Sequence, residues 1–220
     1  MISAVLLNWK RPDNVREIVR RWHGSRFVSE ILIWDNSGQL EPLDGATIVR
    51  ASRNMTFFPR FALACLARHQ CVITQDDDLV TRDEHIEALH NYWLADPDVI
   101  HGIEGRDPKP DGTYATNVNH READVSMCIT RLIMFDRRFA AEFFRALPAF
   151  ADIQAGYEPY GNGEDIVFNY AARRITGRKA RVHRIRPKDL PAPHAVCGAR
   201  GHYEQRSKLM ERGEEWLDSE

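Results

Sequence analysis

Cysteine is scarce in the sequence, and its spacing gives no sign of a metal or redox motif. No two of the four cysteines, Cys65, Cys71, Cys128 and Cys197, stand at Cys-x-x-Cys spacing. Cys65 and Cys71 each lie in an apolar run, where a free thiol packs as a small buried hydrophobic group. We interpret the cysteines as reduced structural residues of a reducing compartment, not as metal ligands or redox groups.

Long hydrophobic runs are also missing. The apolar start of the chain, residues 1–8, is too short for a signal peptide or a membrane span. We interpret this run as a buried first strand. The sequence therefore predicts no membrane span and a cytoplasmic location.

A strong excess of one charge is absent as well. The chain has 30 Lys and Arg against 32 Asp and Glu, a formal net charge of −2. This balance gives no general attraction to nucleic acid or to an anionic membrane, so we predict no nucleic-acid partner. The segment 173–188 is a local exception, with eight Lys or Arg and no Asp or Glu. It could attract an anionic acceptor, but a solvated helix end followed by a charged edge strand is the favoured interpretation.

The sequence does contain enough apolar residues for one sizeable core. Hydrophobic residues make up 43% of its 220 positions, and charged residues make up 28%. This composition is that of an ordinary globular domain, and it needs no disulfide or structural metal to fold. No repeat or low-complexity linker divides the chain. We predict a single domain over residues 1–220, with a nucleotide-binding half at 1–80 and an acceptor-facing half at 81–220.

In the first half, short strand-like runs alternate with amphipathic segments. Strands are predicted at 4–9, 30–35, 47–50 and 71–74, and helices at 12–22 and 57–69. Strands that alternate with helices on short connections form a mostly parallel sheet with helices on both faces. The predicted fold class is therefore α/β, with a mixed, mostly parallel sheet flanked by helices.

The second half is less regular. Strands are predicted at 99–103 and 124–130, and a turn or hairpin loop at 107–112. Helices are predicted at about 136–147 and at 164–175, the second one ending at Gly177. A loop rich in Gly, Tyr and Pro lies between these helices, at 156–163.

Three adjacent carboxylates, Asp76, Asp77 and Asp78, follow the predicted strand at 71–74. Like charges at this separation repel, and a hard divalent cation would offset the repulsion. Mg²⁺ and Mn²⁺ prefer carboxylate oxygens and share their coordination with substrate phosphates. The carboxyl end of a strand is also where open α/β sheets bind ligands. The alternative is a solvated acidic turn that caps the helix beginning near Arg82.

Two further carboxylates, Glu164 and Asp165, follow Gly161-Asn162-Gly163 at a predicted helix start. Acidic residues in a first helical turn complement the helix dipole, and this is the favoured interpretation of the motif alone. In a functional interpretation, Asp165 faces a reacting sugar. A carboxylate there can accept a hydroxyl hydrogen bond or stabilise positive charge at the anomeric carbon.

Other polar residues are individually weak signals. The segment 198–207 places Arg and His before an amphipathic helix, where they could close over a diphosphate; a solvated C-terminal helix explains it equally well. Each of several residues near the ends of predicted strands is, taken alone, better explained as a loop or surface residue. Together they could bind uracil, ribose and phosphate: Asn8, Arg11, Asp35, Asn36, Arg53, Asn54 and Arg60.

In this order along the chain, the motifs resemble the exostosin-type glycosyltransferase domain. This is a retaining α-N-acetylhexosaminyltransferase family with a GT-A fold, the fold of nucleotide-diphospho-sugar transferases. The resembling segments are 7–11, 31–36, 54–61, 75–78, 125–127, 163–169 and 201–207. The aspartate triplet is common to many GT-A enzymes. The segments E-D-I-x-x-N at 164–169 and G-H-x-x-x-R-S at 201–207 are more discriminating.

The resemblance implies a metal-dependent transferase. It would move an N-acetylhexosamine or other hexose from a UDP-sugar to a glycan or other hydroxyl acceptor, with retention of configuration. Asp78 would be the main ligand of Mn²⁺ or Mg²⁺, helped by Asp76. Asp165 and Arg206 would be the catalytic residues, with Arg206 near the phosphates. Asn36, Asn54, Arg60, Asp76 and Asp77 would bind the donor. We also predict that Asn8, Arg11, Asp35 and Glu164 bind it.

Three alternatives stay open at this point. An inverting transferase on the same fold would need a general base, and Asp165 could fill that role too. A nucleotidyltransferase shares the strand-end carboxylates, but it opens with a Gly-rich phosphate loop, whereas here the first strand runs into 8–12, N-W-K-R-P. A non-catalytic module that binds a glycan or UDP is the third alternative.

Overall fold

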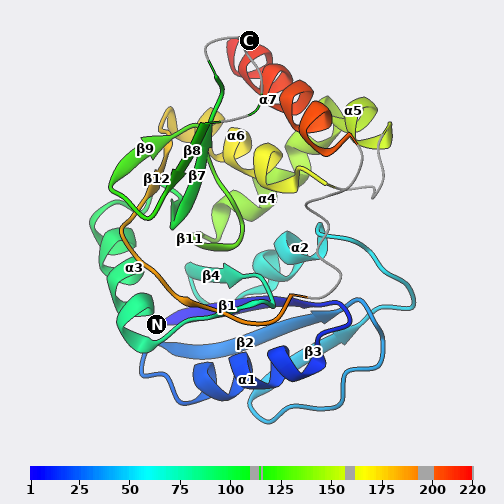
Figure 1. The fold of residues 1–220 in the computed structure, drawn as a ribbon, viewed down its shortest axis with the longest axis vertical. Coiled ribbons are helices and arrows are strands. Elements are labelled where there is room, and N and C mark those ends of the chain that lie inside the picture. Colours follow the sequence, from blue (N-terminus) through cyan, green and yellow to red (C-terminus); the bar gives the residue numbers. More distant parts are fainter. Residues whose placement is uncertain (110–113, 115, 157–161, 193–200, 220) are drawn as a thin grey trace.

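The computed structural model describes residues 1–109, 114, 116–156, 162–192 and 201–219. Within these ranges, eight strands form the main sheet, in the order β3-β2-β1-β4-β11-β6-β12-β9 (Figure 1). Their bounds are β1 Ile2–Asn8, β2 Val28–Asp35, β3 Ala46–Arg50, β4 Cys71–Gln75, β6 His101–Gly102, β9 Ala123–Val125, β11 Leu132–Asp136 and β12 Ala180–Val182. Strands β3, β2, β1 and β4 are parallel, and β11 is antiparallel to β4. The predicted fold class, a mixed and mostly parallel α/β sheet, is confirmed.

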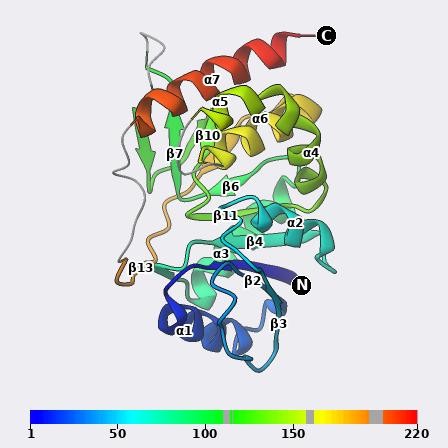
Figure 2. The same cartoon turned by 90° about the vertical axis from the view of Figure 1, so that its right-hand side faces the viewer.

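Helices cover both faces of this sheet. They are α1 Pro12–His23, α2 Pro59–Leu66, α3 Asp83–Ala95, α4 Arg138–Ala146, α5 Ala151–Ala155, α6 Glu164–Thr176 and α7 His202–Asp218, with a 3₁₀ turn at Leu147–Ala149. In Figure 2, α7 lies across the top of the molecule, over α5 and α6. No described helix is long and apolar enough to cross a bilayer.

The alternation along β1 shows how the two faces separate into two cores. Ala4 and Leu6 pack with residues of α1 and α3. Val5, between them, packs instead with residues of α2, α4 and α6. Successive strand residues point to opposite faces, so a strand covered on both sides is buried at every position. Strand β1 has this pattern and is apolar except at Ser3 and Asn8.

Two small sheets complete the fold near the aspartate triplet. Strands β7 (Glu104–Asp107), β8 (Thr116–Asn119) and β10 (Met127–Cys128) form an antiparallel sheet in the order β10-β7-β8. Strand β5 (Leu79–Val80) pairs with β13 (Lys188–Asp189), and the amide of Leu190 donates to the carbonyl oxygen of Asp78 at 2.7 Å. A late segment of the chain thereby returns to hold the loop that carries the aspartates.

The second half differs from the sequence prediction at several elements. Strand β11 was not predicted, because its five buried residues give no alternating pattern and adjoin a strong helix signal. The predicted strand at 124–130 divides into β9 and β10, and that at 99–103 shortens to β6. The prediction that Cys65 is buried is wrong: it lies exposed on the outer side of α2. Cys71 is buried, and Cys197 lies outside the described residues.

Several arginines of the basic segment 173–188 contact acidic or aromatic side chains in other parts of the protein. Arg173 binds Glu214, Arg178 binds Asp96, and Arg181 lies 3.7 Å from Asp124. Arg174 lies over the ring of Trp216. These contacts favour the interpretation of a solvated helix end. The predicted edge strand is wrong, because β12 lies between β6 and β9 and pairs with both.

Gly213 lets α7 pack closely against α6. A Cβ atom at Gly213 would lie 2.5 Å from the ring of Tyr170, which is fully buried and donates from its hydroxyl to Glu214. Although alanine favours helix formation, we expect Gly213→Ala to lower the free energy of unfolding by about 1–3 kcal/mol, because the ring has no room to move. Urea denaturation of both proteins measures this difference.

Gly24 is the matched control for this substitution. It ends α1 at a φ of −82°, and a Cβ atom there would lie no closer than 3.7 Å to its neighbours. Gly24→Ala should therefore leave the stability nearly unchanged or raise it slightly. Equal stabilities of the two variants would show that the helices do not need a glycine at 213.

A buried histidine pair joins α3 to the neighbouring strands β6 and β12. His101 Nδ1 and His183 Nε2 are 2.9 Å apart, and His183 Nδ1 is 2.8 Å from Glu122 Oε2. The ring of Tyr92 stacks on His183. Burial lowers the pKa of His101 from 6.5 to about 4, and burial also lowers the pKa of His183 despite Glu122. Both imidazoles are therefore neutral in the folded protein at pH 7.

This pair makes the stability depend on pH in acid. Between pH 6.5 and about 4 the unfolded chain binds a proton at His101 that the folded protein does not, so stability is lost as the pH falls through that range. We expect a loss on the order of 2 kcal/mol between pH 7 and pH 5 from His101 alone. Denaturation at several pH values measures it. His101→Gln should flatten the profile, and parallel profiles for both proteins would contradict the assignment.

Candidate active site

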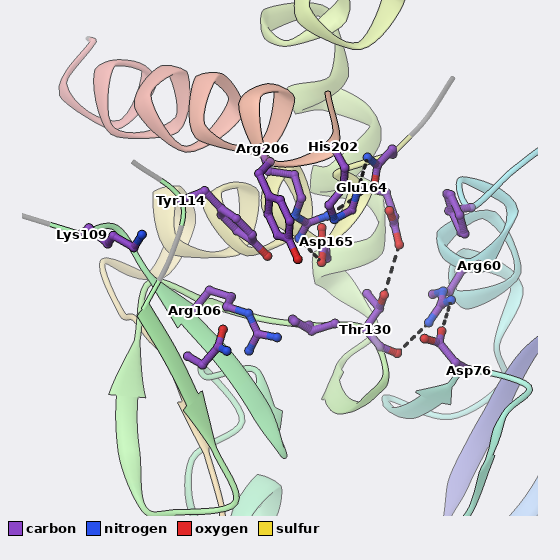
Figure 3. A pocket seen from close by; sticks show the side chains of 15 residues that line it. Arg60, Asp76, Arg106, Lys109, Tyr114, Thr130, Glu164, Asp165, His202 and Arg206 are labelled. Carbon is purple, nitrogen blue, oxygen red and sulfur yellow. Dashed lines mark hydrogen bonds and ion pairs between the residues drawn. The ribbon is translucent and has the colours of Figure 1, made fainter. Parts of the chain in front are cut away.

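A pocket of about 520 Å³ opens between the end of β4 and the β7–β8 pair (Figure 3). Fifteen residues line it: Phe57, Arg60, Asp76, Arg106, Lys109, Tyr114, Asn117, Ile129, Thr130, Asn162, Glu164, Asp165, His202, Tyr203 and Arg206. The first three belong to residues 1–80, and the others to 81–220. Figure 3 shows Arg106 and Lys109 on the wall opposite Arg60 and Asp76.

Asp76 is held on one side of the pocket by Arg60 of α2. Arg60 Nη2 donates to Asp76 Oδ1 at 2.7 Å, and its Nη1 donates to the carbonyl oxygen of Thr130 at 2.7 Å. Only 2% of Arg60 is exposed. Burial opposes its charge, but Asp76 and Glu164 outweigh this effect and raise the pKa of Arg60. Arg60 is therefore a fixed positive charge beside Asp76.

Asp165 is held on the facing side by Arg206 of α7. Arg206 Nη2 donates to Asp165 Oδ2 at 2.6 Å, and both side chains are buried. The guanidinium also lies over the ring of Tyr114. Burial opposes the charge of Arg206, yet Asp165 raises its pKa overall. The close approach of α6 and α7 depends on Gly163, whose φ is +87° and whose added Cβ would meet Leu209.

Thr130 links these two ion pairs. Its hydroxyl donates to Glu164 Oε1 at 3.1 Å, while its carbonyl oxygen accepts from Arg60 (Figure 3). Burial, with a further contribution from Asp165, raises the pKa of Glu164 to about 7. Glu164 can therefore exchange a proton near neutral pH, which is a property of residues in reactive sites.

Asp77 and Asp78 lie beside the pocket and face the end of β1. Arg11 Nη1 is 2.5 Å from Asp77 Oδ1 and 3.6 Å from Asp78 Oδ2. Burial raises the pKa of Asp77 to about 6, and burial and Asp76 raise the pKa of Asp78. The alternative of an acidic helix cap is wrong, because β5 separates the aspartates from α3, which begins at Asp83.

Asp78 fits a hard divalent cation. Its Oδ1 is buried and has no hydrogen-bond partner in the part of the chain that the structure describes. In those same ranges no three His, Cys, Asp or Glu side chains converge on one point, so such a cation would take most of its ligands from outside the protein. Mg²⁺-type sites with one or two carboxylates, substrate phosphates and water have this composition.

Two of the residues predicted to bind the nucleotide, Asn8 and Asp35, end neighbouring parallel strands and bind each other. Asn8 Nδ2 donates to Asp35 Oδ1 at 2.7 Å, and the amide of Leu40 donates to Asp35 Oδ2 at 2.7 Å. Burial raises the pKa of Asp35, but hydrogen bonds from Ser37, Leu40 and Asn8 outweigh it and lower that pKa. Asp35 thus shapes the turn after β2.

The next pair, Asn36 and Asn54, orders the loop before α2. Asn36 Nδ2 donates to the carbonyl oxygen of Thr56 at 2.9 Å, and Asn36 Oδ1 accepts from the amide of Met55 at 2.8 Å. Asn54 Oδ1 accepts from the amide of Thr56 at 2.8 Å. Thr56 has a φ of +61°, so these hydrogen bonds hold a strained turn.

The sequence matches the model of the glycosyl transferase family 64 domain over residues 2–220. The chain belongs to this family. The resemblance to the exostosin-type domain is therefore confirmed. No curated protein sequence is significantly similar to this family 64 chain.

Two solved structures are similar to this family 64 chain. One is GalNAc-T7 with UDP, GalNAc and Mn²⁺, with a TM-score of 0.59 and 14% identity over 96% of this chain and 48% of the other. The second is the mannosyltransferase PcManGT from Pyrobaculum calidifontis with GDP-Man and Mn²⁺, with a TM-score of 0.55 and 13% identity over 100% of this chain and 64% of the other. At these identities the likeness shows the fold, which is GT-A. The chain spans about half to two thirds of the length of these proteins.

The pocket of this family 64 chain brings together five of the twelve residues predicted from the sequence: Arg60, Asp76, Glu164, Asp165 and Arg206. The other seven do not line it: Asn8, Arg11, Asp35, Asn36, Asn54, Asp77 and Asp78. They lie at the ends of β1, β2 and β4 or in the loop before α2.

The opposite wall of the pocket was missed by sequence reasoning. Arg106, Lys109, Tyr114 and Asn117 come from β7, β8 and the residues between them. The only signal was the turn predicted at 107–112, of which residues 110–112 lie outside the described ranges. Arg200, from the segment predicted to close over a diphosphate, also lies outside them.

Proposed function

We propose that this protein transfers a sugar from a UDP-sugar to a hydroxyl group of a carbohydrate or other acceptor, with a divalent cation bound at Asp78. The observation that carries the proposal is the pair of carboxylates, Asp76 and Asp165, each fixed by a buried arginine and both facing one pocket. Asp78, whose buried Oδ1 has no hydrogen-bond partner among the described residues, adjoins them. Membership of a glycosyl transferase family supports the same reaction class.

Each carboxylate has a distinct role in this proposal. Asp78 would bind Mn²⁺ or Mg²⁺, and the cation would neutralise the negative charge that develops on the leaving diphosphate. Asp76 accepts hydrogen bonds from the donor's ribose or sugar while Arg60 holds it in place. Asp165 lies against the transferred sugar. Arg206 lies close to the phosphates and fixes the orientation of Asp165.

The reaction exchanges one bond of the anomeric carbon for another. The bond to the diphosphate oxygen breaks as the bond to the acceptor oxygen forms, and the acceptor's proton passes to the leaving phosphate. Asp165 stabilises the positive charge that develops on the sugar. Attack from the face that the diphosphate leaves gives retention of configuration.

Glu164 supports a second candidate function, the transfer of a sugar with inversion of configuration at the same site. Its pKa of about 7 suits a general base that takes the acceptor's proton near neutral pH. The anomeric configuration of the product, read from the coupling constant of its anomeric proton by NMR, separates the two candidates.

A panel of nucleotide sugars tests the proposed function. We expect UDP release from UDP-N-acetylhexosamines or UDP-hexoses in the presence of Mn²⁺, and loss of release after EDTA. GDP-mannose belongs in the panel, because one similar structure contains it. If the protein binds UDP but consumes no donor with any of the acceptors tested, it is a non-catalytic binding module instead.

A further inference from the structure

Arg11 occupies the place of a cation between two of the aspartates. Its Nη1 lies 2.5 Å from Asp77 Oδ1 and 3.6 Å from Asp78 Oδ2. The arginine side chain is 11% exposed, and those of Asp77 and Asp78 are 10% and 20% exposed. One guanidinium group thus balances part of the charge of the triplet.

The backbone around Arg11 is built onto the aspartate loop. The amide of Trp9 is 3.5 Å from Asp77 Oδ2, and Asn14 Nδ2 donates to the carbonyl oxygen of Asp77 at 2.9 Å. Between them Lys10 has a φ of +61°, a conformation that costs free energy for a residue with a side chain. The contacts with Asp77 hold this strained turn and with it the position of Arg11.

We propose that Arg11 competes with the divalent cation for the aspartates, so that the cation binds well only together with the donor's diphosphate. This inference rests on the proposed metal-dependent function. A cation at Asp78 would lie close to the guanidinium, and like charges at such a distance repel. A diphosphate removes the conflict because arginine pairs with phosphate oxygens as readily as with a carboxylate.

The consequence is a coupling between two ligands. Because the diphosphate draws Arg11 away from Asp77 and Asp78, it raises the affinity for the cation, and the cation raises the affinity for the diphosphate by the same factor. The enzyme without a donor would then hold little metal, and the complete site would form only when the nucleotide sugar is present.

Mn²⁺ binding without nucleotide, followed by the EPR signal of free Mn²⁺, tests the proposal. We expect Arg11→Gln to bind Mn²⁺ about tenfold more tightly than the wild type. Arg11→Lys keeps the charge and should bind Mn²⁺ as weakly as the wild type. If Arg11 only stabilised the fold, its removal would lower the affinity for Mn²⁺. A higher affinity for Mn²⁺ therefore distinguishes competition from a purely structural role. Arg11→Met serves the same purpose if the glutamine variant does not fold.

Lys10 provides the matched control. It is an exposed cation one residue away whose Nζ lies over the ring of Trp9. Lys10→Gln removes the same charge without touching the aspartates and should leave Mn²⁺ affinity unchanged. Equal gains in both variants, or no gain for Arg11→Gln, would overturn the competition. Absence of Mn²⁺ binding to every variant even with UDP would overturn the proposed function itself, so the two failures are distinguishable.

Discussion

Asp78→Asn is expected to lower kcat/KM for the UDP-sugar by about a thousandfold, because a metal ion supplies several kcal/mol of charge stabilisation to a leaving diphosphate. A neutral amide oxygen is a much weaker ligand than the buried carboxylate oxygen that has no protein partner among the described residues. The rate of UDP release with saturating acceptor measures the effect. Part of the loss should be recovered at high Mn²⁺ concentration.

Asp189→Asn is the control for this experiment. Asp189 lies on β13, next to the strand that follows the aspartates, and it pairs with Arg131. Its carboxylate is largely exposed, so its removal changes the local charge without removing a metal ligand. An equal loss of activity in both variants would contradict a specific role of Asp78.

Arg206→Ala is expected to lower the free energy of unfolding by about 3–5 kcal/mol, because it leaves Asp165 buried without its cation. Asp165 is 3% exposed and Arg206 is 5% exposed, so the pair is largely shielded from water although it borders the pocket. Chemical denaturation of the metal-free protein measures the change. The same variant should lose activity, since Asp165 no longer has a fixed orientation.

The double variant Asp165→Leu/Arg206→Met separates the two effects. Replacing both charges by apolar side chains of similar size removes the buried unpaired carboxylate, so we expect most of the lost stability to return. Activity should not return, because Asp165 is the proposed catalytic carboxylate. A double variant as unstable as Arg206→Ala would show that packing of Arg206 on Tyr114, not its charge, stabilises this region.

The sequence predicts the first half of the fold well because each element there carries its own pattern. The strands that become β1 to β4 are short apolar runs, and Pro12 and Pro59 stand at the starts of α1 and α2. These signals are local, so they need no knowledge of partners. The position of the aspartate triplet follows from them, since it directly succeeds a buried strand.

The second half is harder to predict because its elements are defined by pairing at long range. Strand β11 lies between β4 and β6. Its residues are apolar at nearly every position, on both faces of the sheet, so they show no alternating pattern. Strands β6 and β10 have two residues each, which is too short for any periodic pattern. Their existence depends on the neighbours that they bind.

The candidate site shows the same division. Asp165 and Arg206 stand in motifs that are recognisable in the sequence, but their ion pair spans 41 positions and depends on Gly163 at the start of α6. The link between Arg60, Thr130 and Glu164 and the pairing of Arg11 with Asp77 likewise join segments far apart. Residue types predicted these contributors except Thr130, whereas the pairings between them came only from the folded chain.

Anomalous X-ray diffraction at the manganese edge, from crystals grown with UDP and Mn²⁺, tests the metal assignment most directly. We predict one strong peak bound by a carboxylate oxygen of Asp78 and by phosphate oxygens of UDP, with Arg11 turned away from Asp77. UDP bound in the pocket with no manganese peak at Asp78, or with the peak at another site, would contradict the proposed role of the aspartates.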